Sequence, residues 1–480
     1  MSQIKGAMGV RGAGSKAGSA AMEKSGSAAM EKSGDFARRA AAAMTAAAWG
    51  DALGWPQERR RSAGVCVPGI VAPAWERKCG GRYFPHYDLI GAGQYSDDTQ
   101  LMLCVGRALL HGDSWTEYLR RVELPLWTLY ERGGGKAVKK AAQLWLADRA
   151  PWDERCRQSD VADYFGAGGN GAAMRILPHV IALADRDFSE LSGHILSDGI
   201  STHAHPAALV GALAWGYALW SAVRLSSDER AALTPTDPVQ QLLDNKAAWA
   251  AAPDLSALPA AWTDAMRTCH NNWEQLWQEN VDFMVSELEL VRAALSAPQR
   301  PAITEIMESL HSFDRSCSGS GIVAAATALM LSCAHLDQPL EGVKAAAFAL
   351  GSDTDTCASM TASVLALLSD GTWVDSIRDQ VQDAGCIEQL ATSLCNKVTL
   401  DSALPVIKAS ALKKWHSCAM ESHEGQIMEL PDLRCATIHV EDDFLAPCGN
   451  FKVARRTFAV NDGQTLYIKK ISKTRKKEQA

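Results

Sequence analysis

The sequence predicts an all-α protein that carries a small β-rich appendage at its C-terminus. From about residue 35 to residue 400, apolar residues recur at spacings of three and four, and the connecting segments are rich in Gly and Pro. This periodicity is typical of packed amphipathic helices. After about residue 426 apolar and polar residues alternate, which favours strands. We therefore divide the chain into a leader (1–34), a helical domain (35–400), and a linker with the appendage (401–480).

The leader contains a near-perfect tandem octapeptide, GSAAMEKSGSAAMEKSG (18–34). Two copies are too few for a solenoid. The Gly, Ser and Ala content predicts a flexible segment with transient helix in each AAMEK. A disordered tail is favoured over the alternative, an arm that binds a partner.

Helices are expected from the first strong helix formers onward. The stretch FARRAAAAMTAAAWGDALG (36–54) begins the domain, and the helical spacing recurs at 99–111, 136–148, 206–223, 321–336 and 356–369. The segment 206–223 has 18 residues without a charge, which is near membrane-spanning length. Because it is rich in Ala and Gly and follows the polar THAHP, we interpret it as a helix buried in the domain; a single membrane span is the alternative.

The appendage is predicted from three alternating stretches near the C-terminus. These are CATIHV (435–440), NFKVARRTFAV (450–460) and TLYIKKI (465–471). Between the last two, NDGQ (461–464) is typical of a hairpin turn. The sequence therefore predicts a small β structure that ends in a basic tail.

Charge and cysteine usage bound the function. Removing the +3 of residues 1–34 and the +5 of residues 465–480 from the net charge of −7 leaves −15 on the body of the chain. This favours a cation site over a nucleic-acid groove, although the basic tail keeps nucleic acid open as a partner. Thirteen scattered cysteines without a CxxC pair, and an N-terminus without the apolar core of a signal peptide, predict reduced thiols and a cytoplasmic location with no membrane partner.

Two acidic stretches carry the strongest chemical signal. GQYSDDTQLML (93–103) and GSDTDTCASMTASVLALL (351–368) each place carboxylates and hydroxyls between a Gly-containing loop and a long apolar helix. A helix start needs one capping side chain, so either stretch alone would be interpreted as a cap. As a pair they predict one shared site. Clustered hard oxygens suit Mg²⁺, Mn²⁺ or Ca²⁺ better than zinc, and carboxylates packed together need a cation.

Four further motifs add groups of other kinds. GDALGWPQE (50–58) contributes Glu58 after a tight turn, and GAGGNGAAMR (166–175) surrounds Asn170 with glycines. A Gly-rich loop that opens a helix exposes N–H groups to an anion such as a diphosphate, though alone it is more often only a loop. RGGGKAVKKA (132–141) is a similar loop. THAHP (202–206) supplies His203, and also His205, which we interpret as structural.

In this order along the chain, the motifs resemble those of the ADP-ribosylglycohydrolases, the family of the dinitrogenase reductase-activating glycohydrolase. The resemblance covers residues 36–370, and five spaced motifs in one order make it specific. It implies an orthogonal multi-helix domain with a binuclear Mg²⁺ or Mn²⁺ centre in a cleft. The leader and the appendage lie outside the common core of the family.

The resemblance implies three sets of site residues. The metal ligands would be Ser96, Asp97, Asp98, Asp353, Asp355 and Thr356. The substrate pocket would be lined by Gly133, Gly134, Gly135, Gly168, Gly169, Asn170, Gly171 and His203. The acid and base would be Glu58 with Asp97 or Asp98, because glycosidic cleavage uses one group to activate water and one to protonate the leaving atom. Ser96 stands where Thr is common, and Ser352 stands where Gly is usual.

The resemblance therefore implies a metal-dependent hydrolase that acts on an ADP-ribosylated protein and releases ADP-ribose. The bond cut would be the one at C1″ of the distal ribose, with arginine as the first linkage to consider. Two alternatives stay open: a protein that neutralises an ADP-ribosylating partner by binding, and a hydrolase of serine-linked or nucleic-acid-linked ADP-ribose. The intact acidic set argues against a protein that only binds.

Overall fold

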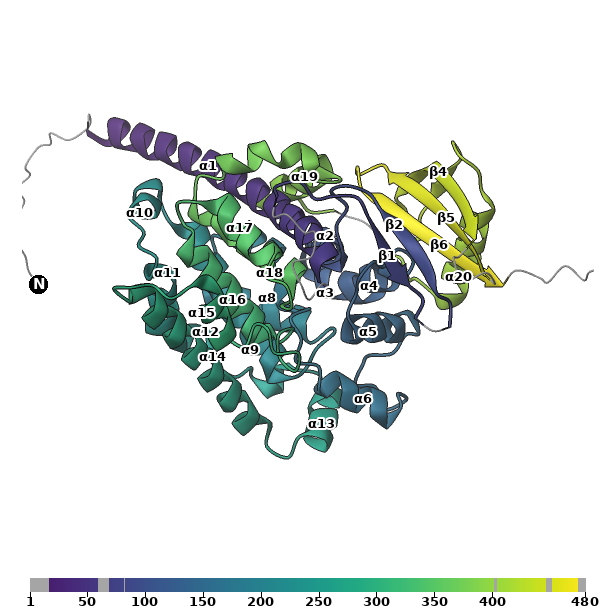
Figure 1. Ribbon diagram of the computed structural model, residues 1–480, viewed down its shortest axis with the longest axis horizontal. Helices are drawn as coiled ribbons and strands as arrows, with labels where there is room; N and C mark the ends of the chain where they lie inside the picture. The colour runs from purple at the N-terminus through teal and green to yellow at the C-terminus, as the bar shows by residue number, and fades with distance from the viewer. Residues whose placement is uncertain (1–16, 59–68, 82, 401–403, 446–450, 474–480) are drawn as a thin grey trace, which may run out of the picture.

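The computed structural model describes residues 17–58, 69–81, 83–400, 404–445 and 451–473. Most of the described chain is helical, and two small antiparallel sheets lie together at one end of the helical domain (Figure 1). The predicted class, all-α with a small β-rich appendage at the C-terminus, is confirmed. The basic tail predicted at 474–480 lies outside the described residues.

The helical domain forms in two stretches of chain. The first contains α1 (Ala17–Gly54), α2 (Asp97–Leu109), α3 (Trp115–Tyr118), α4 (Leu124–Trp127), α5 (Lys136–Leu146), α6 (Gln158–Phe165), α7 (Leu177–Ala182), α8 (Phe188–Gly199) and α9 (Pro206–Arg224). The second contains α10 (Ser227–Ala231), α11 (Asp237–Asp244), α12 (Lys246–Trp249), α13 (Ala260–Cys269), α14 (Trp273–Ser296), α15 (Ile303–Ser309), α16 (Gly321–Ala334), α17 (Pro339–Ala347), α18 (Thr354–Leu368) and α19 (Ala384–Cys395).

Small residues let the central helices approach closely. Every residue of α18 is buried, and α18 packs against α1, α16 and α9. A side chain at Gly50 of α1 would meet the carbonyl oxygen of Ala358 at 2.4 Å, and one at Gly54 would meet that of Thr354 at 2.3 Å. Only glycine fits at such a backbone contact. The two glycines therefore fix how the end of α1 meets the start of α18, and that junction is where the acidic motifs lie.

Helix α9 is the predicted apolar helix of 206–223. Among the described residues it is the one helix long and apolar enough to cross a membrane, and 89% of its apolar window is buried inside the protein. It packs against α16, α8 and α14. Its uncharged surface is covered by other helices, so the interpretation as a core helix is confirmed.

The beginning of α1 differs from the expectation. The sequence predicted a flexible leader up to residue 34, whereas α1 is continuous from Ala17 and projects beyond the rest of the domain (Figure 1). Ala, Met, Glu and Lys are strong helix formers. Once the helix is nucleated by the packed segment that follows, it can extend through the AAMEK repeats without a new nucleation step. Residues 1–16 of the leader lie outside the described residues.

A hairpin before α2 was not predicted. Strands β1 (Trp75–Cys79) and β2 (His86–Ile90) pair antiparallel, with Arg77 opposite Asp88. In β2 the buried positions are His86, Asp88 and Ile90. Because two of these three are polar, the alternation of burial does not show as an alternation of hydropathy.

The appendage agrees with the prediction from alternating residues. It contains α20 (Ala409–Glu421) and a sheet in the order β3 (Ile427–Glu429), β4 (Cys435–Leu445), β5 (Phe451–Val460) and β6 (Thr465–Lys473). The turn predicted at 461–464 joins β5 to β6, and Gly463 has a φ of +90° that favours glycine. Helix α20 packs on β5 and β6. The sheet lies beside the β1–β2 hairpin (Figure 1), where the rings of Phe84 and Phe451 meet edge to face.

Candidate active site

The start of α2 is capped without help from its two aspartates. Ser96 is the N-cap residue, and its hydroxyl accepts a hydrogen bond from the Asp98 N–H at 3.3 Å. The carboxylate of Asp51, at the end of α1, accepts from the N–H groups of Ser96 (3.0 Å) and Thr99 (3.1 Å) and from the Thr99 hydroxyl (2.7 Å). These bonds satisfy donors that every helix start leaves open. The Asp97 and Asp98 carboxylates are therefore not needed as caps.

The start of α18 is built differently. Asp353 is the N-cap residue but makes no side-chain cap bond. Its Oδ2 instead accepts from the Asn170 side chain at 2.9 Å, which ties the glycine loop to the acidic stretch. The Thr354 hydroxyl donates to the Gly54 carbonyl at 2.9 Å, so α18 is joined to the end of α1 as well. The acids of α18 and the turn that carries Glu58 are thereby held together.

One cavity of about 260 Å³ collects most of the predicted site residues. The predicted residues that line it are Glu58, Asp97, Asp98, Gly133, Gly135, Gly169, Asn170, Gly171, His203, Asp353, Asp355 and Thr356. They come from the turn after α1, the starts of α2 and α18, and three loops far apart in sequence. The two acidic stretches are thus brought to one place, as the sequence predicted.

Three predicted residues lie behind the cavity wall. Ser96 is fully buried and serves as the cap of α2. A side chain at Gly134 would meet the Trp127 ring at 2.5 Å, and the Gly168 carbonyl accepts from the Gly321 N–H at 3.0 Å. In this structure the three residues support the surfaces that line the cavity, and none of them forms part of its lining. Their assignment as ligand or substrate contacts remains a prediction.

Burial and like charge act together on the acids of the cavity. Burial is the largest cause that raises the pKa of Asp97, Asp98 and Asp355 well above its usual value. Neighbouring carboxylates add to the effect, first Asp51 beside Asp97 and Asp98, and first Glu58 beside Asp355. Carboxylates that resist ionisation for these two reasons are stabilised by a cation.

His203 faces the acids as a neutral group. Burial, followed by the guanidinium of Arg175, lowers the pKa of His203 to about 3. Arg175 is held by the buried carboxylate of Asp198 at 2.8 Å and donates to the Thr202 hydroxyl at 2.9 Å. The Thr202 oxygen lies 2.8 Å from His203 Nδ1. When the hydroxyl gives its own proton to Nδ1, the proton of the imidazole is on Nε2, and His203 can donate a hydrogen bond into the cavity.

The first glycine loop approaches Asp97 too closely for any other residue. Gly133 has a φ of +106°, and a side chain there would fall 2.7 Å from Asp97 Oδ1. Both the left-handed backbone and the contact require glycine. The loop therefore forms a wall of backbone next to one acid, directly before α5.

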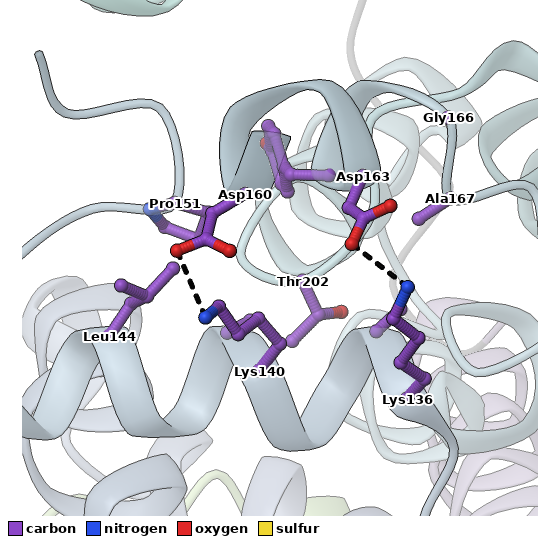
Figure 2. Close-up of a pocket in the computed structure, with 12 residues that line it drawn as sticks. Lys136, Lys140, Leu144, Pro151, Asp160, Asp163, Gly166, Ala167 and Thr202 are labelled. Carbon is purple, nitrogen blue, oxygen red and sulfur yellow. Dashed lines mark ion pairs between the residues drawn. The ribbon is translucent and has the colours of Figure 1, made fainter. Parts of the chain in front are cut away.

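A second pocket adjoins the acidic cavity on the far side of α5. It measures about 250 Å³ and shares Lys136 and Ala137 with the acidic cavity. Figure 2 shows the two ion pairs that bridge α5 and α6 across it, Lys136 with Asp163 (2.8 Å) and Lys140 with Asp160 (3.0 Å). This pocket gives a ligand longer than the acidic cavity a polar, charge-balanced space to extend into.

The residues present fit a pair of hard cations by their chemistry. Asp98 Oδ1 is buried and has no hydrogen-bond partner, and the other donors offered to the cavity are carboxylate and hydroxyl oxygens, which Mg²⁺ and Mn²⁺ prefer. In the described part of the chain, no three His, Cys, Asp or Glu side chains are already arranged round one metal position. The fit therefore rests on donor type, burial and negative charge.

Some residues of the site were missed by sequence reasoning. Asp51 was quoted within GDALG but given no role, although the Asp that follows Gly50 was the available signal. Lys136, Met174 and Gly319 also line the cavity. Lys136 could have been found because it directly follows the glycine loop, whereas Met174 and Gly319 carry no distinctive local pattern.

The fold and the cavity define a glycosidic hydrolase with an acidic centre and a glycine-lined pocket. The sequence model of the ADP-ribosylglycohydrolase family matches residues 32–403, and the chain belongs to that family. Family membership supports a hydrolase that acts on ADP-ribose conjugates. The matched region ends before the C-terminal sheet.

Two further comparisons complete the picture. A solved structure named "ADP-ribosylglycohydrolase-related protein complex" is similar over 76% of this chain and 99% of that chain, with 19% sequence identity and a TM-score of 0.48. A search among curated proteins returned no match.

Proposed function

We propose that the chain is a metal-dependent hydrolase that removes ADP-ribose from ADP-ribosylated arginine in a protein. The observation that supports this most strongly is the meeting of Asp97, Asp98, Asp353 and Asp355 in one cavity with a glycine loop and a neutral imidazole. Two Mg²⁺ or Mn²⁺ ions held by these acids, Thr356 and Ser96 would supply Lewis acidity to the distal ribose hydroxyls and to a water.

The remaining residues have distinct tasks in this proposal. The loop of Gly169, Asn170 and Gly171 presents backbone N–H groups and the Asn170 amide to the ligand, and His203 donates a hydrogen bond from Nε2. Asn170 is also fixed to Asp353. The ligand is thereby oriented by groups whose own positions are set by hydrogen bonds, which is the condition for efficient positioning of C1″.

Hydrolysis requires one group to take a proton from water and another to protonate the leaving atom. As water adds to C1″, the C1″–N bond breaks and the guanidine nitrogen takes the bonding pair and a proton. Glu58 is exposed at the edge of the cavity and can exchange protons with solvent, whereas Asp97 and Asp98 are buried. We assign the acid and base to Glu58 and one of these two aspartates.

The charge of the cavity supports arginine as the linkage. A guanidine leaving group becomes a cation when it is protonated, and an exposed carboxylate at the cavity edge stabilises that charge. A serine hydroxyl or a nucleic-acid base leaves without a lasting positive charge. We therefore expect faster release from arginine than from the other two linkages.

The test uses the full chain and three ADP-ribose conjugates. Proteins ADP-ribosylated at arginine or serine, and an ADP-ribosylated oligonucleotide, are incubated with the enzyme and Mg²⁺ or Mn²⁺, and free ADP-ribose is measured by mass spectrometry. Release from the arginine conjugate is expected to stop with EDTA and to return with added cation. In the same assay Glu58→Gln is expected to slow turnover about a hundredfold while cation binding is retained. Failure to release ADP-ribose from all three conjugates with either cation would overturn the proposal.

A further inference from the structure

Arg132 is a buried guanidinium at the entrance to the glycine loop 133–135. Only 2% of its side chain is exposed, and its backbone N–H donates to the Gln100 side chain at 3.2 Å. The next residue, Gly133, is the one in contact with Asp97. A shift of Arg132 would therefore move the backbone that lines the acidic cavity.

The C-terminal sheet holds one face of Arg132. The guanidinium lies 4.2 Å from the centre of the Tyr467 ring of β6, a distance at which a cation and an aromatic face attract. The Tyr467 hydroxyl accepts from the Gln94 side chain at 2.5 Å and donates to that of Gln382 at 2.8 Å. Gln94 in turn accepts from Arg132 at 2.8 Å. Tyr467 therefore contacts Arg132 both directly and through Gln94.

The charge of Arg132 is also balanced through the sheet. Asp88, 1% exposed, lies 3.8 Å from Arg132, 2.8 Å from Lys469 of β6 and 3.7 Å from Arg455 of β5. Burial alone would raise the pKa of Asp88, but Lys469 and then Arg132 hold it below its usual value. One buried carboxylate thus serves a cation of the helical domain and two of the appendage. Breaking such a group by removing one partner leaves an uncompensated buried charge.

On its other side Arg132 faces the turn that leads to Glu58. Its guanidinium is 5.9 Å from the centre of the Trp55 ring, and Trp55 begins the short 3-10 turn Trp55–Gln57. Arg132 is therefore packed between a strand of the appendage and two segments of the cavity, the Glu58 turn and the loop 133–135.

We infer that strand β6 is a positioning part of the cavity: Tyr467 fixes Arg132, and Arg132 fixes the loop 133–135 against Asp97. The sheet lies outside the family match, so this support is additional to the helical domain. Tyr467 and Arg132 are positioning residues, because neither lines the cavity. The consequence for ADP-ribose binding rests on the proposed function, whereas the consequence for the loop does not.

Three substitutions in β6 separate positioning from general loosening of the sheet. Tyr467→Leu keeps an apolar side chain but removes the ring and its hydroxyl. Tyr467→Phe keeps the ring under Arg132 and removes only the hydroxyl. Ile468→Ala is the matched control, because Ile468 is the next residue, is fully buried, and belongs to the apolar cluster that includes α20. Ile468→Val replaces it if the alanine variant does not fold.

Two measurements are made on the full chain with each variant. Hydrogen exchange followed by mass spectrometry reports on the peptides that cover residues 131–137, and calorimetry reports the Kd for free ADP-ribose with Mg²⁺ present. In Tyr467→Leu we expect exchange of this loop to become at least about fivefold faster and the Kd to rise about tenfold. In Tyr467→Phe most of both properties should be retained. In the Ile468 variant both should stay near wild type although its Tm falls.

The outcomes separate this inference from the proposed function. If the Ile468 variant changes loop exchange as much as Tyr467→Leu does at a similar loss of Tm, the sheet acts only through overall stability and the inference is wrong. Wild-type loop exchange in Tyr467→Leu would overturn it as well. If wild-type protein binds no ADP-ribose but loop exchange follows the expected order, the positioning role stands and the proposed function fails alone.

Discussion

The starts of α2 and α18 contain similar residues but satisfy their backbone N–H groups in different ways. At α2, Ser96 caps the helix and Asp51, from another helix, accepts further N–H bonds. At α18, Asp353 occupies the cap position and makes no cap bond, because its carboxylate is engaged by Asn170. One start is capped from outside, and the other gives up its cap to a loop.

The difference shows why helix capping does not account for the acids. At α2 capping is complete before Asp97 and Asp98 are considered, and at α18 the capping residue is used for another contact. Both arrangements leave buried carboxylates facing one cavity, where burial and neighbouring acids raise the pKa of Asp98 and Asp355. Such groups are retained at a loss of stability, which is typical of functional sites. The comparison therefore separates residues that hold the helices from residues that act in the cavity.

The largest expected effect follows from removing a charge at α18. Asp353→Asn or Asp355→Asn keeps shape and one oxygen but removes a negative charge from a site proposed to hold two dications. Hydrolysis of ADP-ribosyl-arginine is expected to fall about a thousandfold or more, while circular dichroism stays unchanged. In EDTA the Asp355→Asn protein should melt at a higher temperature, because a buried carboxylate that resists ionisation is gone.

Asp113→Asn serves as the control for these two variants. Asp113 is exposed and lies outside the cavity, so its substitution should change neither rate nor melting temperature. A wild-type rate in Asp355→Asn, together with no response to chelation, would return both acidic stretches to the role of helix caps.

A smaller effect, on stability, is expected at the outside cap of α2. Asp51→Ala removes the acceptor of the Ser96 and Thr99 N–H groups and leaves them buried. We expect a loss of about 3 kcal/mol in the free energy of unfolding, measured in urea. Asp97→Asn, two turns of chain away from any cap bond, should leave that free energy equal or higher in metal-free protein. Equal losses in the two variants would erase the distinction between holding and acting residues.

The sequence was sufficient to predict the acids but not the residues that hold them. Asp97 and Asp355 stand in a local pattern, an acid pair between a loop and an apolar helix, and such a pattern is visible in a few adjacent residues. Asp51 acts on Ser96 across 45 residues, and we had read its motif as a turn. Because α1 continues to Gly54, Asp51 projects from a helix end toward α2, and only the packing of the two helices shows this.

The same limit explains the hairpin and its contact with the appendage. The strands of the appendage were predicted because their buried residues are apolar, as at Phe458 and Ile468. Strand β2 was not predicted, because Asp88 is buried through Lys469, which is 381 residues away. A buried charge is stable only with its partner, and no local pattern identifies a partner at that distance.

The pH dependence of stability gives a test with two opposite signs. His203 has a folded pKa of about 3, below the usual 6.5. Between these values the unfolded chain binds the proton first, so this contribution to stability is lost as pH falls from 6.5 toward 3. For the acids of α2 and α18 the folded pKa is raised, so their contribution is present at low pH and is lost as pH rises.

We therefore expect His203→Gln to flatten the acid side of the stability profile. In wild-type protein the His203 contribution should fall by about 2 kcal/mol between pH 7 and pH 5, and urea unfolding at the two pH values measures it. The variant should show a smaller fall by that amount. An identical pH profile in the variant would show that the imbalance attributed to His203 is absent.

The smallest expected effect concerns Ser96, the residue on which the two helix starts differ most. In the structure its hydroxyl caps α2 and lies outside the cavity lining, whereas the family resemblance assigns it to the metal. Ser96→Ala should reduce the free energy of unfolding by about 1 kcal/mol if capping is its task, with a Kd for Mg²⁺ within about twofold of wild type. Ser96→Thr keeps the oxygen and should restore stability, provided that the buried site accepts one methyl group. Unfolding in urea and calorimetric titration with Mg²⁺ measure the two quantities separately. A Kd that rises tenfold in Ser96→Ala and recovers in Ser96→Thr would instead make Ser96 a ligand, and the start of α2 would then combine capping and cation binding in a single hydroxyl.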